Sequence, residues 1–191
     1  NLASMRDGLI VTAILILLSA ALHGQTLNYS SFVVQYCDSL RIPLSVVWNL
    51  SGDHLGKVKR SSSMRFYEEK NVPTPRATSE DYARSGYDRG HMCPAADRSK
   101  SVASMRETFV MTNITPQVTT LNRGPWKYLE DYERKLALRG RKLRIVAESV
   151  FWRAPKLFIG RDSVAVPHGF IKTIRDQETD TIIISKYFPN L

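Results

Sequence analysis

The residues Asp88 to His91, with the sequence DRGH, place a candidate base two positions from a candidate phosphate-binding cation. His91 could accept a proton at neutral pH, because the unperturbed pKa of histidine lies near about 6.5. Positions i and i+2 of a strand share a face, so Arg89 could clamp the phosphate that a His91-activated water attacks. Gly90 between them would let substrate or a backbone turn approach closely. The pattern indicates phosphodiester cleavage, which needs a base and a cation at the phosphate.

Oxygen-bearing side chains further along the chain could hold a metal ion for this reaction. Mg²⁺ prefers oxygen ligands and keeps several waters, and Asn113, Asn122 and Glu130 offer such oxygens. Asn122 directly precedes the predicted start of a helix, and Glu130 lies two turns further along it. Glu130 and Arg134 have the i, i+4 spacing, acid first, that favours an ion pair on a helix.

Each of these residues also has a simpler structural interpretation. A single histidine near a turn is more often solvated, or hydrogen-bonded in a core, than catalytic, and Asp88 beside Arg89 is usually a local ion pair. Asn122 is suited to cap the helix. Glu130 and Arg134 could form an ordinary surface pair that contributes a few tenths of a kcal/mol. Only the occurrence of these residues together favours catalytic chemistry.

The elements that must position these residues can be predicted from periodicity and composition. β-branched and aromatic residues predict strands at 42–50, 108–114, 142–152, 163–174 and 180–188. Apolar residues recur at helical spacing from Pro125, which suits a first helical turn, to Gly140, which suits a C-terminal stop. Residues 56–86 are polar and basic and predict a long irregular excursion. We therefore expect an α+β fold with a central antiparallel or mixed β-sheet.

The composition is that of one globular domain with a basic surface. The chain of 191 residues contains 27 Lys and Arg against 18 Asp and Glu, a net charge of +9. This charge favours polyanionic partners, nucleic acid first and an acidic membrane surface second. Cys37 and Cys93 could pair in an exported protein or remain buried thiols, and their spacing forms no zinc motif.

Residues 1–24 have the pattern of a secretory signal peptide, with residues 1–4 as an upstream remnant. Arg6 is followed by an apolar run that is short for a membrane span, and then by small residues. Because Asp7 offsets Arg6, an uncleaved membrane anchor stays open. We expect a secreted or periplasmic protein, without a stable membrane partner if the leader is cleaved, and a functional domain at 25–191.

Three motifs in a fixed order resemble those of the DNA/RNA non-specific endonucleases, the ββα-metal (His-Me finger) family that includes endonuclease G. They are SGYDRGHMCPAAD, ETFVMTNITPQ and LNRGPWKYLEDYERKL, and the resemblance extends from about Val46 to Asn190. It implies a ββα-metal active-site motif and Mg²⁺-dependent hydrolysis of phosphodiester bonds. DNA and RNA, single- or double-stranded and of any sequence, are the implied partners. Mn²⁺ or another divalent cation could replace Mg²⁺.

The resemblance also implies a role for each residue at the core of the site. His91 matches the general base that activates water, and Arg89 matches the phosphate-contacting arginine of the same motif. Asn122 matches the sole direct protein ligand of the metal ion, and Glu130 matches the helix glutamate that holds a metal-bound water. Because the base must be neutral, activity should fall at acid pH.

Further residues match supporting positions of the family. Arg134 matches the arginine that stabilises charge at the cleaved phosphate, and Asn113 matches a supporting active-site asparagine. Another family arginine lies upstream, where Arg60 is the better match and Arg65 its rival. The chain departs from the family pattern outside this set, at 147–151 (AESVF) and at His168.

Two further points concern the C-terminal end of the sequence and the alternative functions. The chain stops at KYFPNL, where family members usually continue, and the sequence leaves open whether this end is natural or a C-terminal truncation. A catalytically inactive nucleic-acid-binding protein on the same fold is the main alternative, although the base, the metal ligand and the arginines are all present. A secreted structural domain would explain the basic charge but not the order of the motifs. The sequence leaves open whether the protein forms a homodimer.

Overall fold

The computed structural model describes residues 24–191. The predicted signal peptide therefore lies outside the described residues except for Gly24, and the upstream remnant at 1–4 lies wholly outside them. Within 24–191, no helix is both long and apolar enough to cross a bilayer.

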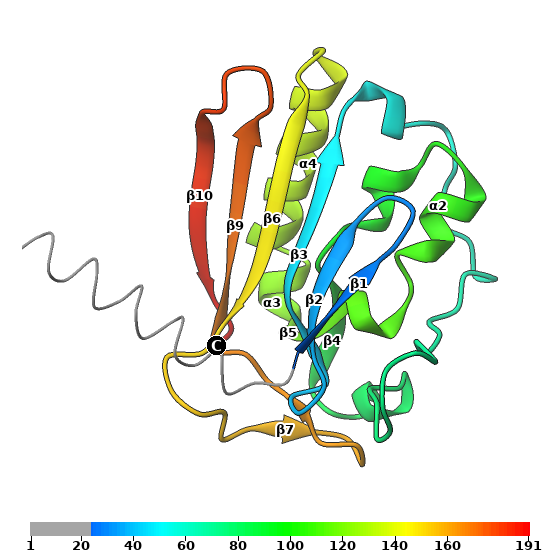
Figure 1. The fold of residues 1–191 in the computed structure, drawn as a ribbon, viewed down its shortest axis with the longest axis vertical. Coiled ribbons are helices and arrows are strands. Elements are labelled where there is room, and N and C mark those ends of the chain that lie inside the picture. Colours follow the sequence, from blue (N-terminus) through cyan, green and yellow to red (C-terminus); the bar gives the residue numbers. More distant parts are fainter. Residues whose placement is uncertain (1–23) are drawn as a thin grey trace, which may run out of the picture.

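A six-stranded sheet, which we call the main sheet, forms one layer of the protein in the order β1-β2-β3-β6-β9-β10 (Figure 1). All neighbouring strands in it pair antiparallel. The strands are β1 (Gly24–Asn28), β2 (Val33–Cys37), β3 (Ile42–Leu50), β6 (Leu143–Val150), β9 (Gly169–Asp176) and β10 (Ile182–Pro189). The predicted α+β class with a central antiparallel sheet is confirmed.

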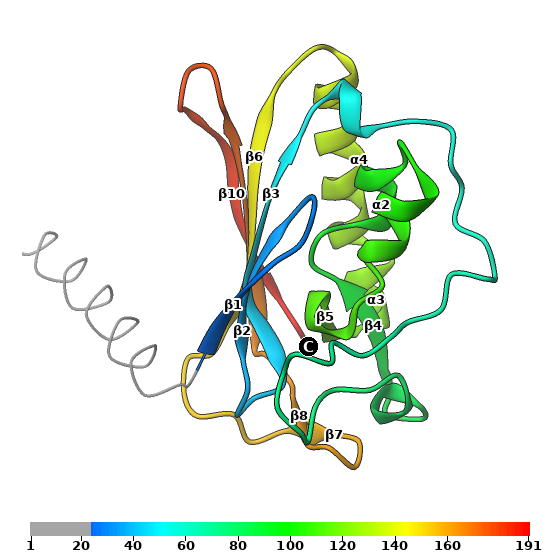
Figure 2. The same ribbon diagram turned by 45° about the vertical axis from the view of Figure 1, so that its right-hand side comes forward.

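The helices and a smaller sheet lie together on one side of the main sheet (Figure 2). The helices are α2 (Val102–Glu107), α3 (Thr119–Asn122) and α4 (Pro125–Leu138), and the smaller sheet pairs β4 (Tyr87–His91) with β5 (Ile114–Val118). A short pair, β7 (Phe158–Ile159) and β8 (Val164–Ala165), lies at one end of the main sheet (Figure 2). Single 3-10 turns occur at Gly52–His54, Glu80–Tyr82, Ala95–Arg98 and Met111–Asn113.

The core forms where alternating side chains of the main sheet meet α4. In β9, Phe170 and Ile174 are fully buried, whereas Ile171, Thr173 and Arg175 are partly exposed. On α4, Trp126 and Leu129 belong to the same buried cluster, and the Trp126 ring lies 5.6 Å from the ring of Phe170. This packing fixes α4 against the sheet and so fixes the polar side chains that α4 carries.

Several predicted elements are confirmed and one is divided. β3 spans the predicted strand, and α4 begins at Pro125 and is followed by Gly140, whose φ of +90° suits glycine. The strand predicted at 163–174 consists instead of β8 and β9, with Pro167 between them. Proline lacks the N–H that a ladder needs, which explains the break.

The strand predicted at 108–114 is wrong. Thr108 caps the C-terminal end of α2, a 3-10 turn follows at Met111–Asn113, and β5 begins only at Ile114. The apolar residues of this stretch, including Phe109, are fully buried. Their composition therefore reflects burial rather than an extended backbone. The helix α2 was not predicted, because six residues are too few to show a helical period.

Candidate active site

The second strand of the smaller sheet, β5, leads directly into helices. The antiparallel register pairs His91 with Ile114 and Arg89 with Pro116, and the chain continues from β5 through α3 into α4. The indole Nε1 of Trp126, near the start of α4, donates to the backbone oxygen of His91 at 3.2 Å. This contact ties the helix to the end of β4, and the three elements form the ββα arrangement that the resemblance implies.

An open groove of about 1520 Å³ runs along this ββα arrangement and the loop at 55–60. Cations outnumber carboxylates along its walls, which hold Lys57, Lys59, Arg60, Arg89, Arg123, Lys127, Arg134 and Lys135 against Asp88, Glu130 and Asp131. A concave surface with this excess of positive charge favours a polyanionic ligand.

The groove brings together all but one of the predicted site residues. Those that line it are Arg60, Arg89, His91, Asn122, Glu130 and Arg134. The exception is Asn113, which is fully buried behind the groove. Its Oδ1 accepts from the backbone N–H of Cys93, and its Nδ2 donates to the carbonyls of Cys93 and Thr108, each at 2.9 Å. Asn113 therefore holds the backbone just after His91 and does not reach the groove.

His91 lies at the base of the groove between two aromatic rings. Its imidazole is 5.0 Å from the ring of Phe109, edge-on, and 5.5 Å from the ring of Phe66. The Nε2 atom is buried without a hydrogen-bond partner, so Nδ1 is the ring nitrogen that faces the groove. Burial, together with the positive charge of Arg60, lowers the pKa of His91 to about 3. The imidazole is therefore neutral at neutral pH and has a free lone pair.

Two arginines flank His91, and Phe66 supports both of them. The guanidinium of Arg89 lies 5.1 Å from the centre of the Phe66 ring and donates to the backbone oxygen of Ser79 at 3.1 Å. The guanidinium of Arg60 lies 5.8 Å from the centre of the Phe66 ring and 4.9 Å from that of Phe109. Arg65 lines a smaller adjoining cavity of about 580 Å³ and not the main groove. The geometry thus favours Arg60 over Arg65 as the upstream arginine.

Asp88 does not pair with Arg89, contrary to the local ion pair considered from the sequence. Its carboxylate binds Arg123 instead, with both contacts at 2.9 Å, and also accepts from Nδ2 of Asn122 at 3.0 Å. Burial raises the pKa of Asp88, but the hydrogen bonds from Arg123 and Asn122 outweigh it and lower the pKa overall. Asp88 therefore stays ionised and orients the Asn122 amide.

Asn122 is not a helix cap. It is the last residue of α3, and the N-cap position of α4 is Gly124, which has no side chain to bond. Because Nδ2 is held by Asp88, the amide oxygen Oδ1 is left without a hydrogen bond from any residue of 24–191. This oxygen lies on the groove wall, where it could bind a cation.

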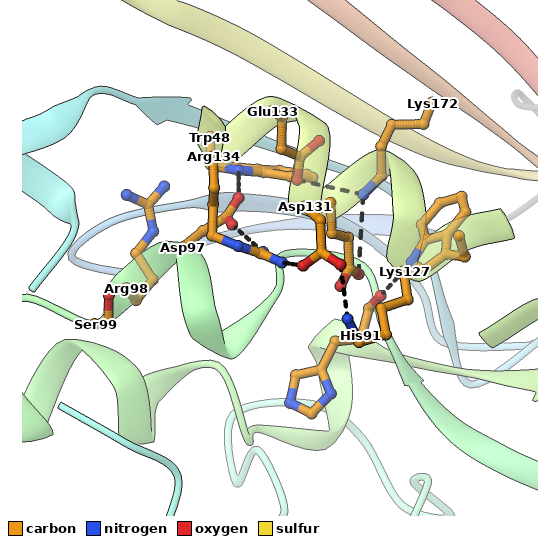
Figure 3. Close-up of polar contacts among 12 residues, drawn as sticks. Trp48, His91, Asp97, Arg98, Ser99, Lys127, Asp131, Glu133, Arg134 and Lys172 are labelled. Carbon is orange, nitrogen blue, oxygen red and sulfur yellow. Dashed lines mark hydrogen bonds and ion pairs between the residues drawn. The ribbon is translucent and has the colours of Figure 1, made fainter. Parts of the chain in front are cut away.

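Glu130 and Arg134 do not form the predicted i, i+4 ion pair. Glu130 Oε1 lies 4.0 Å from Nζ of Lys172 on β9. Arg134 binds Asp97 at 2.8 Å and Asp131 at 2.6 Å, as Figure 3 shows. Burial raises the pKa of Glu130 to about 7, against the opposing charge of Lys172. Glu130 is therefore a weakly solvated carboxyl group whose partner comes from the main sheet.

The residues of the groove fit a hydrated divalent cation better than a caged one. No cluster of three or more His, Cys, Asp or Glu side chains that could hold a metal occurs among the described residues. Mg²⁺ keeps several waters and needs few protein ligands. The free Oδ1 of Asn122, with the Glu130 carboxyl on the same groove wall, suits one direct ligand and one indirect contact.

Gly90 serves packing rather than substrate approach. A Cβ atom at this position would lie 2.4 Å from Cδ of Gln117 on β5, which is closer than real atoms approach. Gln117 is fully buried, and neither of its side-chain polar atoms has a partner. The glycine of DRGH is therefore required by the neighbouring strand, not by the groove.

The two cysteines are free thiols, and both are buried. Cys93 directly follows the turn after His91, and burial raises its pKa to about 12. A thiol with so high a pKa is unreactive at neutral pH. The disulfide considered from the sequence is therefore not formed.

Sequence reasoning missed three residues that hold this site together. Phe66 supports the arginines and the base, Asp97 holds Arg134, and Lys172 approaches Glu130. Asp97 accepts a further hydrogen bond from Nε1 of Trp48 at 2.9 Å. For Lys172 a signal existed, because it alternates with Phe170 and Ile174 on the buried face of a strand, where lysine is rare.

Comparison with known proteins agrees with this geometry. The family model for DNA/RNA non-specific endonucleases matches residues 18–188. A nuclease of Nostoc sp. is 39% identical over 120 residues, which cover 62% of this chain and 43% of the relative. The mitochondrial nuclease EXOG of Danio rerio is 32% identical over 174 residues, which cover 83% of this chain and 50% of the relative.

A solved structure shares the fold as well. The crystal structure of an EndoG/EndoGI complex matches with a TM-score of 0.78 and 28% sequence identity, over 87% of this chain and 74% of the solved chain. The chain spans about half the length of the curated relatives it matches. The match to the family model, which covers most of the chain, establishes that this protein belongs to the DNA/RNA non-specific endonuclease family.

Proposed function

We propose that this protein is a divalent-metal-dependent endonuclease that hydrolyses phosphodiester bonds in DNA and RNA without sequence preference. The observation that carries the proposal is the arrangement of His91 in the groove. Its Nδ1 faces a cationic groove whose wall also holds the free oxygen of Asn122 and the carboxyl group of Glu130. A base, a cation ligand and phosphate-binding arginines thus share one surface.

His91 would act as the general base. Nδ1 accepts a proton from the attacking water, and Nε2 keeps its hydrogen between the aromatic rings of Phe66 and Phe109. A phosphate bound between Arg60 and Arg89 would offset the positive charge that lowers the pKa of His91. Substrate binding would therefore raise the pKa of His91 toward the range in which a base accepts protons efficiently.

Asn122 would hold the divalent ion through Oδ1, and Glu130 would hold one of the waters of the ion. When bound, the ion supplies positive charge at the scissile phosphate and at the departing oxygen. Asp88 keeps the Asn122 amide in the required orientation through the hydrogen bond at 3.0 Å. Mg²⁺ and Mn²⁺ both suit this set of oxygen groups.

The arginines would position the nucleic acid. Arg60, from the loop at 55–60, and Arg89, from β4, would clamp the phosphate, and Arg134 would face it from α4. Arg134 is already held by Asp97 and Asp131, so it would contact the phosphate without reorganising. Contacts of this kind address the backbone and carry no base information, which explains an activity indifferent to sequence.

Incubation with plasmid DNA and with RNA, in Mg²⁺ or in EDTA, tests the proposal directly. We expect cleavage of both substrates in Mg²⁺, none in EDTA, and a loss of at least about 100-fold in His91→Ala. His168→Ala is a matched control, because His168 lies outside the groove. Cleavage that survives His91→Ala would contradict the assignment of the base. Tight binding of nucleic acid without cleavage by the wild type would support an inactive binding protein instead.

A further inference from the structure

Lys172 is a buried cation next to the groove, and no step of the proposed reaction uses it. Its side chain has no exposed surface and lies on β9 between the buried residues Phe170 and Ile174, on the face that packs against α4. An apolar side chain would be expected at such a position. Burying an ammonium group is unfavourable unless opposite charge compensates it.

Two carboxylates and two aromatic rings surround the Lys172 ammonium. Its Nζ lies 3.5 Å from Oε1 of Glu133 and 4.0 Å from Oε1 of Glu130. The centres of the rings of Trp126 and Trp48 lie 4.3 Å and 5.4 Å away, distances at which a cation is attracted to a ring face. In Figure 3 the lysine extends toward Glu133 from above the helix, with a dashed contact to it.

The two carboxylates differ in where they lie. Glu133 has no exposed side-chain surface, lies outside the groove, and accepts no hydrogen bond at either oxygen. Glu130 lies one turn earlier on α4, is 15% exposed at its side chain, and lines the groove. Lys172 therefore joins a carboxylate enclosed in the core to one that lines the groove.

The two tryptophan rings beside Lys172 also contact other residues of the site. Trp126 donates a hydrogen bond to the backbone of His91, and Trp48 donates one to Asp97, which holds Arg134. The lysine is thus surrounded by groups that fix the base and the helix arginine. A substitution of Lys172 would therefore affect the residues of the groove from the core side.

We propose that Lys172 is a positioning residue for Glu130, whose carboxylate it holds at the groove wall so that Glu130 can bind a water of the divalent ion. The inference rests on the proposed function, in which Glu130 has that role. Without the ammonium, the Glu130 carboxylate would lose the positive charge 4.0 Å away that holds it, whereas Glu133 is enclosed in the core. Glu130, the one with access to solvent, would then turn away from its position.

A simpler account is that Lys172 only neutralises Glu133, to which its contact is shorter. The two accounts can be separated by removing both members of that buried pair. Replacing a buried ion pair with apolar side chains of similar size is often neutral for stability. Lys172→Met combined with Glu133→Met therefore leaves the core packed while Glu130 loses its only cationic partner within 24–191.

Binding of Mn²⁺ to the full chain without nucleic acid, followed by electron paramagnetic resonance, gives a readout independent of cleavage. We expect Lys172→Met and the double variant each to weaken Mn²⁺ binding about tenfold, as loss of a partner behind a metal contact does. Glu133→Met alone should change it less than about threefold, because Lys172 still holds Glu130. Lys142→Met, which removes an exposed ion pair with Glu178, should have no effect.

The double variant is decisive even if Lys172→Met alone does not fold. A folded double variant that binds Mn²⁺ as tightly as the wild type would overturn the inference and leave Lys172 as a partner of Glu133 only. A wild-type protein that binds no Mn²⁺ would instead contradict the metal site of the proposed function itself. Weakened binding in the double variant with retained binding in Glu133→Met would support the role assigned to Lys172.

Discussion

The main sheet and the smaller β4–β5 sheet bury different kinds of side chain. In the main sheet the fully buried positions are mostly apolar, as at Val34, Val46 and Ile145. In β5 they include Thr115 and Gln117, whose side-chain polar atoms have no hydrogen-bond partners. The first sheet is built to be stable, whereas the second holds polar groups that weaken it.

This difference indicates that the β4–β5 sheet, which carries the proposed base, is less stable because it buries polar groups. A buried polar atom without a partner costs about 1–3 kcal/mol, and His91 Nε2 at the end of β4 is a further example. Thr115 pairs with Gly90 and Gln117 with Asp88, so both face the strand that carries the proposed base. Lys172 is a charged residue buried in the main sheet, and it points toward Glu130 on the wall of the same groove.

The largest expected effect tests the stability of the main sheet. Ile145→Ala deletes a fully buried side chain in the middle of β6 and should lower the free energy of unfolding by about 3 kcal/mol. Urea denaturation measures this loss. The matched control is Ile182→Ala on β10, where the side chain is 55% exposed and the effect should stay below about 1 kcal/mol. Equal losses of unfolding free energy in the two variants would contradict the view that the buried apolar positions stabilise the main sheet.

The next effect belongs to the groove and should leave stability almost unchanged. Asn122→Ala removes the proposed metal ligand, and we expect cleavage of plasmid DNA in Mg²⁺ to fall about 100-fold. Its free energy of unfolding should change by less than about 1 kcal/mol, since only one hydrogen bond to Asp88 is lost. Asn71→Ala, on the exposed loop, serves as the control. Wild-type cleavage by Asn122→Ala would argue against the ligand assignment.

A smaller effect concerns the close contact within the β4–β5 sheet. Gly90→Ala should destabilise the protein by about 2 kcal/mol, because the new Cβ would overlap the side chain of Gln117. In a Gln117→Ala background the same substitution should be nearly neutral, which a double-mutant cycle by urea denaturation can show. Additive effects of the two substitutions would mean that the contact does not explain the glycine.

The smallest effect is the dependence of stability on pH. The pKa of His91 is lowered to about 3, below the value of about 6.5 in an unfolded chain. Protons therefore bind preferentially to the unfolded state. The contribution of neutral His91 to stability is complete above about pH 6.5 and is lost as the pH falls toward 3.

Urea denaturation at pH 7.5 and pH 5.5 checks this contribution. Between the two pH values we expect the wild type to lose about 1 kcal/mol relative to His91→Gln. The comparison with the variant cancels the titration of other groups. An identical pH dependence in both proteins would show that His91 is not held neutral by its surroundings.

The sequence predicts those parts of the fold that depend on local pattern. The strand β3 was predicted from its β-branched and aromatic residues, and α4 from apolar residues that repeat with a helical period over fourteen residues. The stretch 108–114 was misassigned because β-branched residues also occur in buried turns. Its backbone is set by Asn113, which donates to the carbonyl of Thr108, and by an isolated bridge between Val110 and Tyr67 rather than by a strand ladder.

The residues that line the site were predicted better than their partners. The motif order placed His91, Asn122 and Glu130 in one groove, as the structure shows. The partner of Arg134 is Asp97, 37 residues away, and the partner of Glu130 is Lys172, on another layer. Such contacts depend on how layers pack, and helix spacing alone predicted the wrong pair.

Chemical rescue of His91→Gly tests the central claim most directly. The glycine variant leaves a space between the rings of Phe66 and Phe109 that free imidazole can enter. We predict that the variant cleaves plasmid DNA about 1000-fold more slowly than the wild type in Mg²⁺. Added imidazole should increase the cleavage rate of the variant at least about tenfold. Cleavage by His91→Gly at the wild-type rate without imidazole would contradict the account.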